Sequence, residues 1–357
     1  MLAPSKAVNK VEPDAARAAW IANQLLNGEL PLLVVDRLCI SGVSRDAASR
    51  DVATALADPY LDSALLRARR GRKTAALLEL QYAMWRRAAE SKGICELREL
   101  DCERFAEDFY FANRPFIFRG GAADWRAIGT WSPAWFRERY GSVEIDYSAV
   151  EGAKRYARQG PDLARTTLRE FVDRIETTVA SNEYYLTASS RTMTVGGPLA
   201  GLSADIAPLP FAPEMSRKWT RSLNLWLGPR GTLTQLHHDL INVLFVQVWG
   251  TKEFILGPSF GLPLMRNRFA VYSEIDPLVP SPDSESGSAD LAWLRFTVEP
   301  GDVVFIPAGW WHWVYASTAS ISVGLTDVNV AGQTDELPII SGRLVLSNEL
   351  EATSAAH

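Results

Sequence analysis

Two short segments decide the fold: LHHDL at residues 236–240 and GDVVFIPAGWWH at residues 301–312. The first reads as the end of one β-strand, and the second as a strand, a tight turn and the start of another strand. Successive side chains of a strand point to opposite faces, so His237 and Asp239 share one face while His238 points the other way. His312 ends the second segment, and we expect a neighbouring strand to bring it to the face of His237 and Asp239.

These three residues make a candidate metal site. Two imidazoles and one carboxylate form the 2-His-1-carboxylate facial triad, which leaves coordination positions open on a non-haem ferrous ion. The chain has four His in all, including His238 and the C-terminal His357, so a histidine-rich site has essentially one place to be. His238 shares its face with Leu240, which offers no donor, and we therefore exclude His238 from the ligand set. The hypothesis is an iron-dependent oxygenase.

Length and composition argue against several other classes of protein. The 357 residues allow about two domains, and a 47% hydrophobic content is ample for a sizeable core. A formal net charge of −5 and a pI near 5.6 argue against a broadly electrostatic nucleic-acid binder. No stretch reaches the roughly 18 uninterrupted apolar residues of a membrane span, so we expect no membrane partner. The three cysteines lack CxxC and CxxH spacing, which favours reduced thiols and a cytoplasmic location.

Residues 1–92 are expected to form a small helical region that begins with a frayed tail over about residues 1–12. Apolar residues recur at helical spacing from Asp14, a plausible N-cap, to Leu26. Further helices are expected over Arg45–Leu56 and Leu61–Ser91, the second interrupted or bent near Gly71.

The long helix raises two alternatives that the sequence leaves open. The basic run at residues 67–73 has the composition of a solvated helix face, and the other reading is a docking surface for an acidic partner. The apolar residues that follow fit either a core or a homodimer contact; they are Leu77, Leu78, Leu80, Tyr82, Met84 and Trp85.

Residues 93–335 are expected to form a barrel domain, with residues 336–357 as a C-terminal tail. Ser132 is a candidate helix N-cap, Val143–Val150 alternates like a strand, and Thr167–Thr177 has the pattern of an amphipathic helix. Tyr184–Thr187 is a further expected strand, and Pro277–Asp290 reads as a polar loop. Many short strands separated by turns predict a double-sheet barrel, a jelly roll. The strands expected in it are Leu223–Leu227, Leu233–Asp239, Val243–Val248, Glu253–Leu256, Leu294–Val298, Val303–Ile306, His312–Ala316 and Ser320–Leu325.

Both deciding segments also match the pattern of a known family. Gly231, five residues, HxD and then Gly250 resemble the first half of the cupin motif, and residues 301–312 resemble the second half. Asp239 stands where most cupins have a second His, and no Glu follows it three or four residues later. This departure moves the resemblance to the JmjC-type, cupin-like 2-oxoglutarate oxygenases, whose core is a double-stranded β-helix.

Three flanking stretches narrow the resemblance further. LWLGPRGTLT at 225–234, QVWGTK at 247–252 and IPAGWWH at 306–312 look like the protein-hydroxylase branch of this family. That branch includes the asparaginyl hydroxylase factor inhibiting hypoxia-inducible factor. The similarity covers about residues 95–330, so the N-terminal helical region lies outside it.

The resemblance implies roles for six residues of this chain. His237, Asp239 and His312 correspond to the iron ligands. Lys252, thirteen residues after Asp239, corresponds to the Lys that pairs with the far carboxylate of 2-oxoglutarate. Thr234 matches a hydroxyl donor to the same carboxylate, and Tyr185 resembles a third donor. Two asparagines that the family often carries are replaced, one by Val243 and one by Gly324.

The function implied is hydroxylation of a protein or peptide side chain with Fe(II), 2-oxoglutarate and O2, releasing succinate and CO2. If the attacked carbon bears an N-methyl group, the product collapses as a demethylation. A histone-type demethylase is disfavoured, because nothing in the chain resembles a chromatin-reading module and its net charge is acidic. Two alternatives stay open: a hydroxylase of a free amino acid or natural-product intermediate, and a non-catalytic cupin-like binding protein.

Overall fold

A computed structural model describes the chain at residues 15–89, 93–149, 163–212, 223–269, 271–279, 291–326 and 328. It divides into two compact units, Met1–Leu80 and Gln81–His357. The predicted frayed tail, the predicted cap at Asp14, most of the predicted loop at 277–290 and the predicted tail at 336–357 lie outside the described residues. The predicted domain boundaries after residues 92 and 335 stay predictions. None of the helices described is long and apolar enough to cross a membrane.

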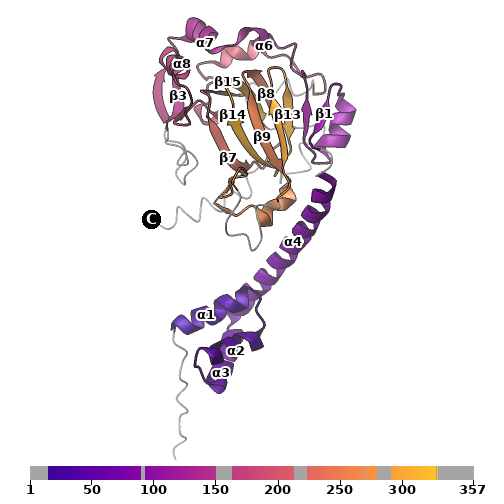
Figure 1. Cartoon of the computed structure of the whole chain (residues 1–357), viewed down its shortest axis with the longest axis vertical. Coiled ribbons are helices and arrows are strands. Elements are labelled where there is room, and N and C mark those ends of the chain that lie inside the picture. Colours follow the sequence, from indigo (N-terminus) through magenta and orange to yellow (C-terminus); the bar gives the residue numbers. More distant parts are fainter. Residues whose placement is uncertain are drawn as a thin grey trace, which may run out of the picture. The chain divides into compact units, whose positions relative to one another are not determined.

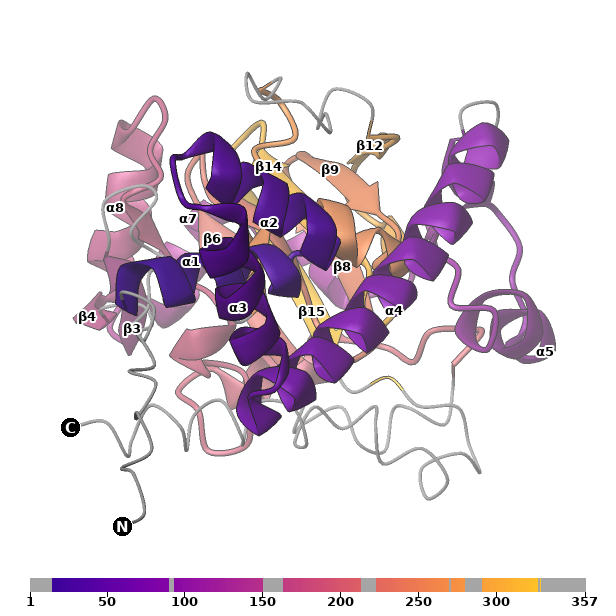
Figure 2. The same cartoon turned by 90° about the horizontal axis from the view of Figure 1, so that it is seen from below.

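Helices make up the described part of the first unit. They are α1 (Ala15–Leu26), α2 (Pro31–Ile40), α3 (Arg45–Leu56) and most of α4 (Pro59–Ala89), and Figures 1 and 2 show α1 to α3 grouped at the first turns of α4. Ile21, Val34 and Val52 are among the side chains of its core. The sequence pattern does not predict α2, because apolar side chains lie on both of its faces and hide the helical period. The interruption expected at Gly71 is wrong, since α4 continues through it.

The end of α4 belongs to the second unit. Tyr82 is buried, and its hydroxyl accepts a hydrogen bond from the backbone N–H of Ala292 at 2.6 Å. Trp85 lies edge-on to Trp310, with ring centroids 6.2 Å apart. The core reading is therefore confirmed for Tyr82 and Trp85. The rest of the set is not buried: Leu77, Leu80 and Met84 are exposed and Leu78 is half-buried, and a homodimer stays a prediction.

Two six-stranded sheets form the barrel, which confirms the predicted double-stranded β-helix, and several of their strands are labelled in Figure 1. One sheet has the order β1-β2-β13-β8-β15-β6, and the other β10-β11-β7-β14-β9-β12. The bounds of the first are β1 Cys95–Leu97, β2 Phe116–Phe118, β13 Val303–Ile306, β8 Val243–Trp249, β15 Ser320–Thr326 and β6 Leu223–Gly228. Those of the second are β10 Asn267–Phe269, β11 Tyr272–Ser273, β7 Leu233–His238, β14 Trp311–Ala316, β9 Lys252–Gly257 and β12 Leu294–Val298.

Alternation along the strands separates the barrel interior from the core that lies under the helices. In β8, Val243 and Phe245 join a cluster formed by inward side chains of both sheets, whereas Leu244 and Val246 join a cluster shared with the helices. Ser132 caps α7 as predicted, and the amphipathic helix expected from Thr167 begins one residue later, with Thr167 as its N-cap. The helices of this unit are α5 Cys102–Arg104, η1 Phe105–Tyr110, α6 Arg126–Thr130, α7 Pro133–Tyr140, α8 Leu168–Thr177, η3 Ala188–Ser190, η4 Ala200–Asp205 and η7 Ser259–Leu264.

A small third sheet extends the barrel beside β6. It has the order β4-β3-β5, with β4 at Leu163–Thr167, β3 at Glu144–Ala149 and β5 at Tyr184–Tyr185. The strand expected over Tyr184–Thr187 is thus shorter than predicted, although Leu186 still bridges to Leu227 of β6. This bridge places Tyr185 at the edge of the barrel interior.

Candidate metal centre

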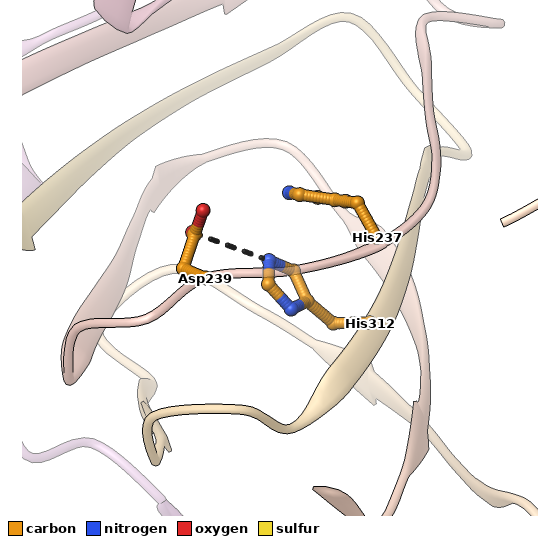
Figure 3. A group of neighbouring side chains, drawn as sticks. All are labelled: His237, Asp239 and His312. Atoms are coloured by element: carbon orange, nitrogen blue, oxygen red, sulfur yellow. Dashed lines mark ion pairs between the residues drawn. The ribbon is translucent and has the colours of Figure 1, made fainter. Parts of the chain in front are cut away.

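The structure brings His237, Asp239 and His312 together. β7 ends at His238, β14 begins at Trp311, and the antiparallel register of these strands pairs His312 with His237. The three side chains each offer one ligand atom, and these atoms all lie within 4.8 Å of one another. Figure 3 shows the side chains converging, with His312 Nε2 3.7 Å from an Asp239 carboxylate oxygen. Two imidazoles and a carboxylate at this spacing fit a facial triad.

Backbone carbonyls fix the tautomer of both imidazoles. The Nδ1 of His237 lies 2.8 Å from the carbonyl oxygen of Gln235, and that of His312 lies 3.0 Å from the carbonyl of Trp310. A carbonyl oxygen only accepts, so each Nδ1 carries the hydrogen in the neutral ring. Each Nε2 therefore has its lone pair available for a metal ion, because its partner nitrogen is occupied.

Burial keeps His312 in the neutral form that a metal requires. Its side chain is 5% exposed, and this burial, together with the neighbouring His237, lowers the pKa of His312 below the usual value for an imidazole. Ligation needs the unprotonated ring, so the site has one preorganised nitrogen donor at neutral pH. Asp239 is more open, with 40% of its side chain exposed.

Thr234 lies on the same side as His237, although strict alternation would place residues three apart on opposite faces. The explanation is a β-bulge in β7: His312 pairs with His237 and Val314 pairs with Thr234, so β7 uses three steps where β14 uses two. Both Thr234 and His237 therefore line the same cavity. The sequence contains no separate signal for this bulge.

The triad lies on the wall of a cavity of about 410 Å³ inside the barrel. The inner faces of both sheets contribute apolar walls, among them Val243, Phe245 and Ile306. All six residues singled out in the sequence line it, namely Tyr185, Thr234, His237, Asp239, Lys252 and His312. Of the tryptophans near the two deciding segments, Trp226 lines the cavity, whereas Trp311 and Trp313 pack on the other face of their sheet.

Lys252 is a buried cation in this cavity. It is 1% exposed, and its Nζ donates a hydrogen bond to the Tyr185 hydroxyl at 2.9 Å. Among the described residues no carboxylate pairs with it, and burial lowers the pKa of Lys252 to about 7. A buried ammonium without a counter-charge is costly, so this end of the cavity suits an anionic group.

Val243 and Gly324 occupy the two positions at which the family often carries an asparagine, and an asparagine lies near each of them. Asn242 comes directly before Val243 and does not line the cavity. Its side-chain oxygen accepts a hydrogen bond from the N–H of Ala308 at 2.9 Å and so supports the turn before β14. Gly324 lines the cavity, and Asn224 faces it directly across the β15–β6 ladder. Asn224 also lines the cavity and donates to Thr326 Oγ1 at 3.5 Å. The neighbouring strand therefore supplies an amide where Gly324 has none.

The sequence reasoning missed several polar residues of the cavity: Ser148, Asn224 and Thr326. Asn224 and Thr326 could have been found from strand alternation. Asn224 lies two residues before Trp226 and Thr326 lies two residues after Gly324, so each shares a face with a residue that lines the cavity. Ser148 comes from the third sheet, where it pairs with Tyr185. Its hydroxyl is fully buried and has no hydrogen-bond partner in the described part of the chain.

His238 points away from the triad, as the alternation predicts. Its ring packs edge-on against Trp311, with centroids 4.6 Å apart, and its Nδ1 is buried with no hydrogen-bond partner among the residues described. Desolvation lowers the pKa of His238, so the ring is neutral at neutral pH. It serves as a packing residue on the far side of β7.

Several proteins of known name are similar to this chain. It is 27% identical over 249 residues to "Bifunctional peptidase and (3S)-lysyl hydroxylase JMJD7" of Homo sapiens. The matched region covers 61% of this chain and 78% of that protein. It is 29% identical over 234 residues to "Lysine-specific demethylase JMJ30" of Arabidopsis thaliana, covering 63% of this chain and 52% of that protein. It is 24% identical over 244 residues to "Jumonji C domain-containing protein 5" of Drosophila melanogaster, covering 64% of this chain and 59% of that protein.

The matched region coincides with the barrel that carries the triad. The chain spans little more than half the length of the second and third of these relatives. Residues 102–331 match the profile of the family described as "Cupin-like domain", which confirms the resemblance found in the two deciding segments. The chain therefore belongs to the cupin-like domain family and is similar to its JmjC-type members.

Proposed function

We propose that this chain is an Fe(II)- and 2-oxoglutarate-dependent hydroxylase of a protein or peptide side chain. One observation carries the proposal: a single cavity is lined by a His-Asp-His triad and by a buried Lys252, with which no carboxylate of the described residues pairs. The triad suits a metal ion, and the lysine suits the far carboxylate of a dicarboxylate that reaches from that ion into the barrel. A bound ferrous ion supplies the oxidative decarboxylation of 2-oxoglutarate by O2 and the oxidation of the substrate carbon.

The side chains of the cavity each have a part in this chemistry. His237, Asp239 and His312 would hold the metal, through the two Nε2 atoms and one carboxylate oxygen. Lys252 and Tyr185, which are joined by a hydrogen bond, would hold the far carboxylate, and Thr234 lines the same cavity. The apolar walls formed by Val243, Phe245 and neighbouring residues exclude water, which strengthens each electrostatic contact.

The relatives favour a protein substrate over a free metabolite. The human relative is named a lysyl hydroxylase and the Arabidopsis relative a lysine-specific demethylase, and both names refer to an amino-acid side chain. Hydroxylation and demethylation share the oxidation step and differ in whether the attacked carbon bears a nitrogen. We assign hydroxylation, the activity in the name of the human relative.

The proposal is tested by following succinate formation in the purified protein. We expect 2-oxoglutarate to be converted to succinate in the presence of Fe(II) and O2, slowly without substrate and faster with a peptide that is modified. Removing the metal with a chelator should stop the conversion, and adding Fe(II) back should restore it. Peptide products should be heavier by one oxygen atom in mass spectrometry. A protein that binds neither Fe(II) nor 2-oxoglutarate would contradict the proposal.

Binding of 2-oxoglutarate is expected to take up a proton above neutral pH. Burial lowers the pKa of Lys252 to about 7 in the empty cavity, and a carboxylate next to Nζ raises it again. Below pH 7 the lysine is already charged and the affinity is at its maximum. Above pH 7 the affinity falls by up to about tenfold per pH unit, because the amine must first be protonated.

Calorimetry of 2-oxoglutarate binding at pH 8, in two buffers with different heats of ionisation, measures this proton uptake directly. Lys252→Met is the matched control, since it keeps a linear side chain and removes the titrating group; it should bind more weakly and take up no proton from this position. Equal heats in both buffers for the wild type would contradict the assignment of Lys252.

A further inference from the structure

Tyr272 covers the imidazole of His237 at the cavity wall. The two rings stack with centroids 5.6 Å apart and an angle of 30° between their planes, and both residues line the cavity. The backbone register places them opposite each other, because Tyr272 of β11 pairs with His237 of β7. On the metal side, the His237 ring lies 3.9 Å from the ring of His312. The His237 ring therefore has an aromatic neighbour in both directions.

The hairpin that carries Tyr272 is fixed in place. The carbonyl oxygen of Tyr272 accepts a hydrogen bond from the Asn267 side chain at 2.8 Å, and the Ser273 hydroxyl donates to the carbonyl of Met265. Met265 is fully buried in the cluster on the outer face of the sheet. The N–H of His238 also donates to the carbonyl of Val271 at 3.0 Å. Contacts on both sides of Tyr272 thus hold its ring against the ligand strand.

His237 is the imidazole ligand that needs such support. His312 is almost fully buried, so packing restricts its ring on every side. Asp239 is tied through its backbone carbonyl, which accepts the N–H of Gly309 at 2.7 Å. The His237 ring is half-buried, and among the described residues its one hydrogen bond goes to the carbonyl of Gln235 on its own strand. That bond sets the tautomer but leaves the ring free to tilt about the Nδ1–H direction.

We propose that Tyr272 is a positioning residue for the metal centre, which holds the His237 imidazole in the plane that directs Nε2 at the ion. The proposal rests on the proposed function for the identity of that ion, and on the ring geometry for everything else. A ligand kept in its binding orientation loses little freedom on coordination, and supporting residues around metal ligands commonly change metal affinity by about 10- to 100-fold.

The test uses the full chain and Co(II), whose visible absorption reports both binding and coordination geometry. Tyr272→Phe keeps the stacked ring, whereas Tyr272→Leu keeps apolar bulk and removes the ring. We expect Tyr272→Phe to bind Co(II) within about twofold of the wild type, and Tyr272→Leu to bind about tenfold more weakly with an altered absorption band. Tyr315→Leu is the control, since Tyr315 stacks on Trp313 of the same sheet at 5.9 Å but does not line the cavity.

Thermal unfolding of the metal-free variants separates positioning from simple loss of stability. If Tyr272→Leu and Tyr315→Leu lose similar stability and only Tyr272→Leu loses Co(II) affinity, the positioning role is supported. Unchanged Co(II) affinity and absorption in Tyr272→Leu overturn it, as does an equal loss of affinity in Tyr315→Leu. A wild-type protein that binds no Co(II) overturns the metal site itself, and with it the proposed function.

Discussion

Asp239→Ala is expected to abolish tight Fe(II) binding and to lower 2-oxoglutarate turnover by at least about a hundredfold. Asp239 is the carboxylate of the triad, and its removal leaves two neutral imidazoles to hold a divalent cation. Loss of the anionic ligand removes both a donor and the charge that partly neutralises the ion. The metal content of protein purified under anaerobic conditions with Fe(II), followed by succinate formation, measures both effects.

His238→Ala is the matched control for this variant. His238 is adjacent to Asp239 in sequence, but its ring packs against Trp311 on the opposite face of β7. Iron binding should therefore persist in His238→Ala, even if the loss of packing lowers its stability. Iron retention in Asp239→Ala, or iron loss confined to His238→Ala, would show that the ligand set has been assigned to the wrong face of the strand.

Gly250→Ala is expected to lower the free energy of unfolding by about 3 kcal/mol or more. Gly250 joins β8 to β9 with a φ of +72°, a left-handed conformation that strains any residue with a Cβ. A Cβ there would overlap the carbonyl oxygen of Ala319 and lie 2.6 Å from the Thr318 hydroxyl oxygen. Part of what meets it is backbone, so a rotamer change cannot relieve the overlap.

Urea denaturation measures this change, with Gly129→Ala as the control. Gly129 lies in α6, where a Cβ would meet nothing within 4 Å, so the substitution should be neutral or stabilise by up to about 1 kcal/mol. Similar midpoints for the two variants would mean that the β8–β9 turn can change conformation. Because Lys252 follows the turn by two residues, a surviving Gly250→Ala protein should also bind 2-oxoglutarate more weakly.

The strands of the barrel and the triad could be predicted from sequence because both depend on local spacing. Leu294–Val298 and Val303–Ile306 form strands at the expected bounds, since turn residues flank each run. The HxD spacing fixes the face of two ligands without any knowledge of the fold. The third ligand followed from the tight turn before His312 and from the small number of histidines in the chain, independently of any family resemblance.

What could not be predicted depends on contacts between segments far apart in the chain. Helix α2 has no amphipathic period, and the short β10–β11 hairpin is stable because it pairs with β7. Tyr272 lies over thirty residues from His237, and no pattern in the sequence announces that the two rings stack. Ser148 enters the cavity from β3 of the third sheet, where it pairs with Tyr185 of β5, a partner that only the folded chain specifies.

Because of the bulge in β7, Thr234 and His237 share a face although they are three positions apart in the sequence. This odd spacing matters for the evolution of the site. Deleting Gln235 or Leu236 would leave two steps between Thr234 and His237, and a regular ladder keeps two residues at that spacing on one face. A second deletion would place them one step apart and turn one of them out of the cavity. A variant chain can therefore lose the bulge and keep the site, but it cannot then lose another residue between Thr234 and His237.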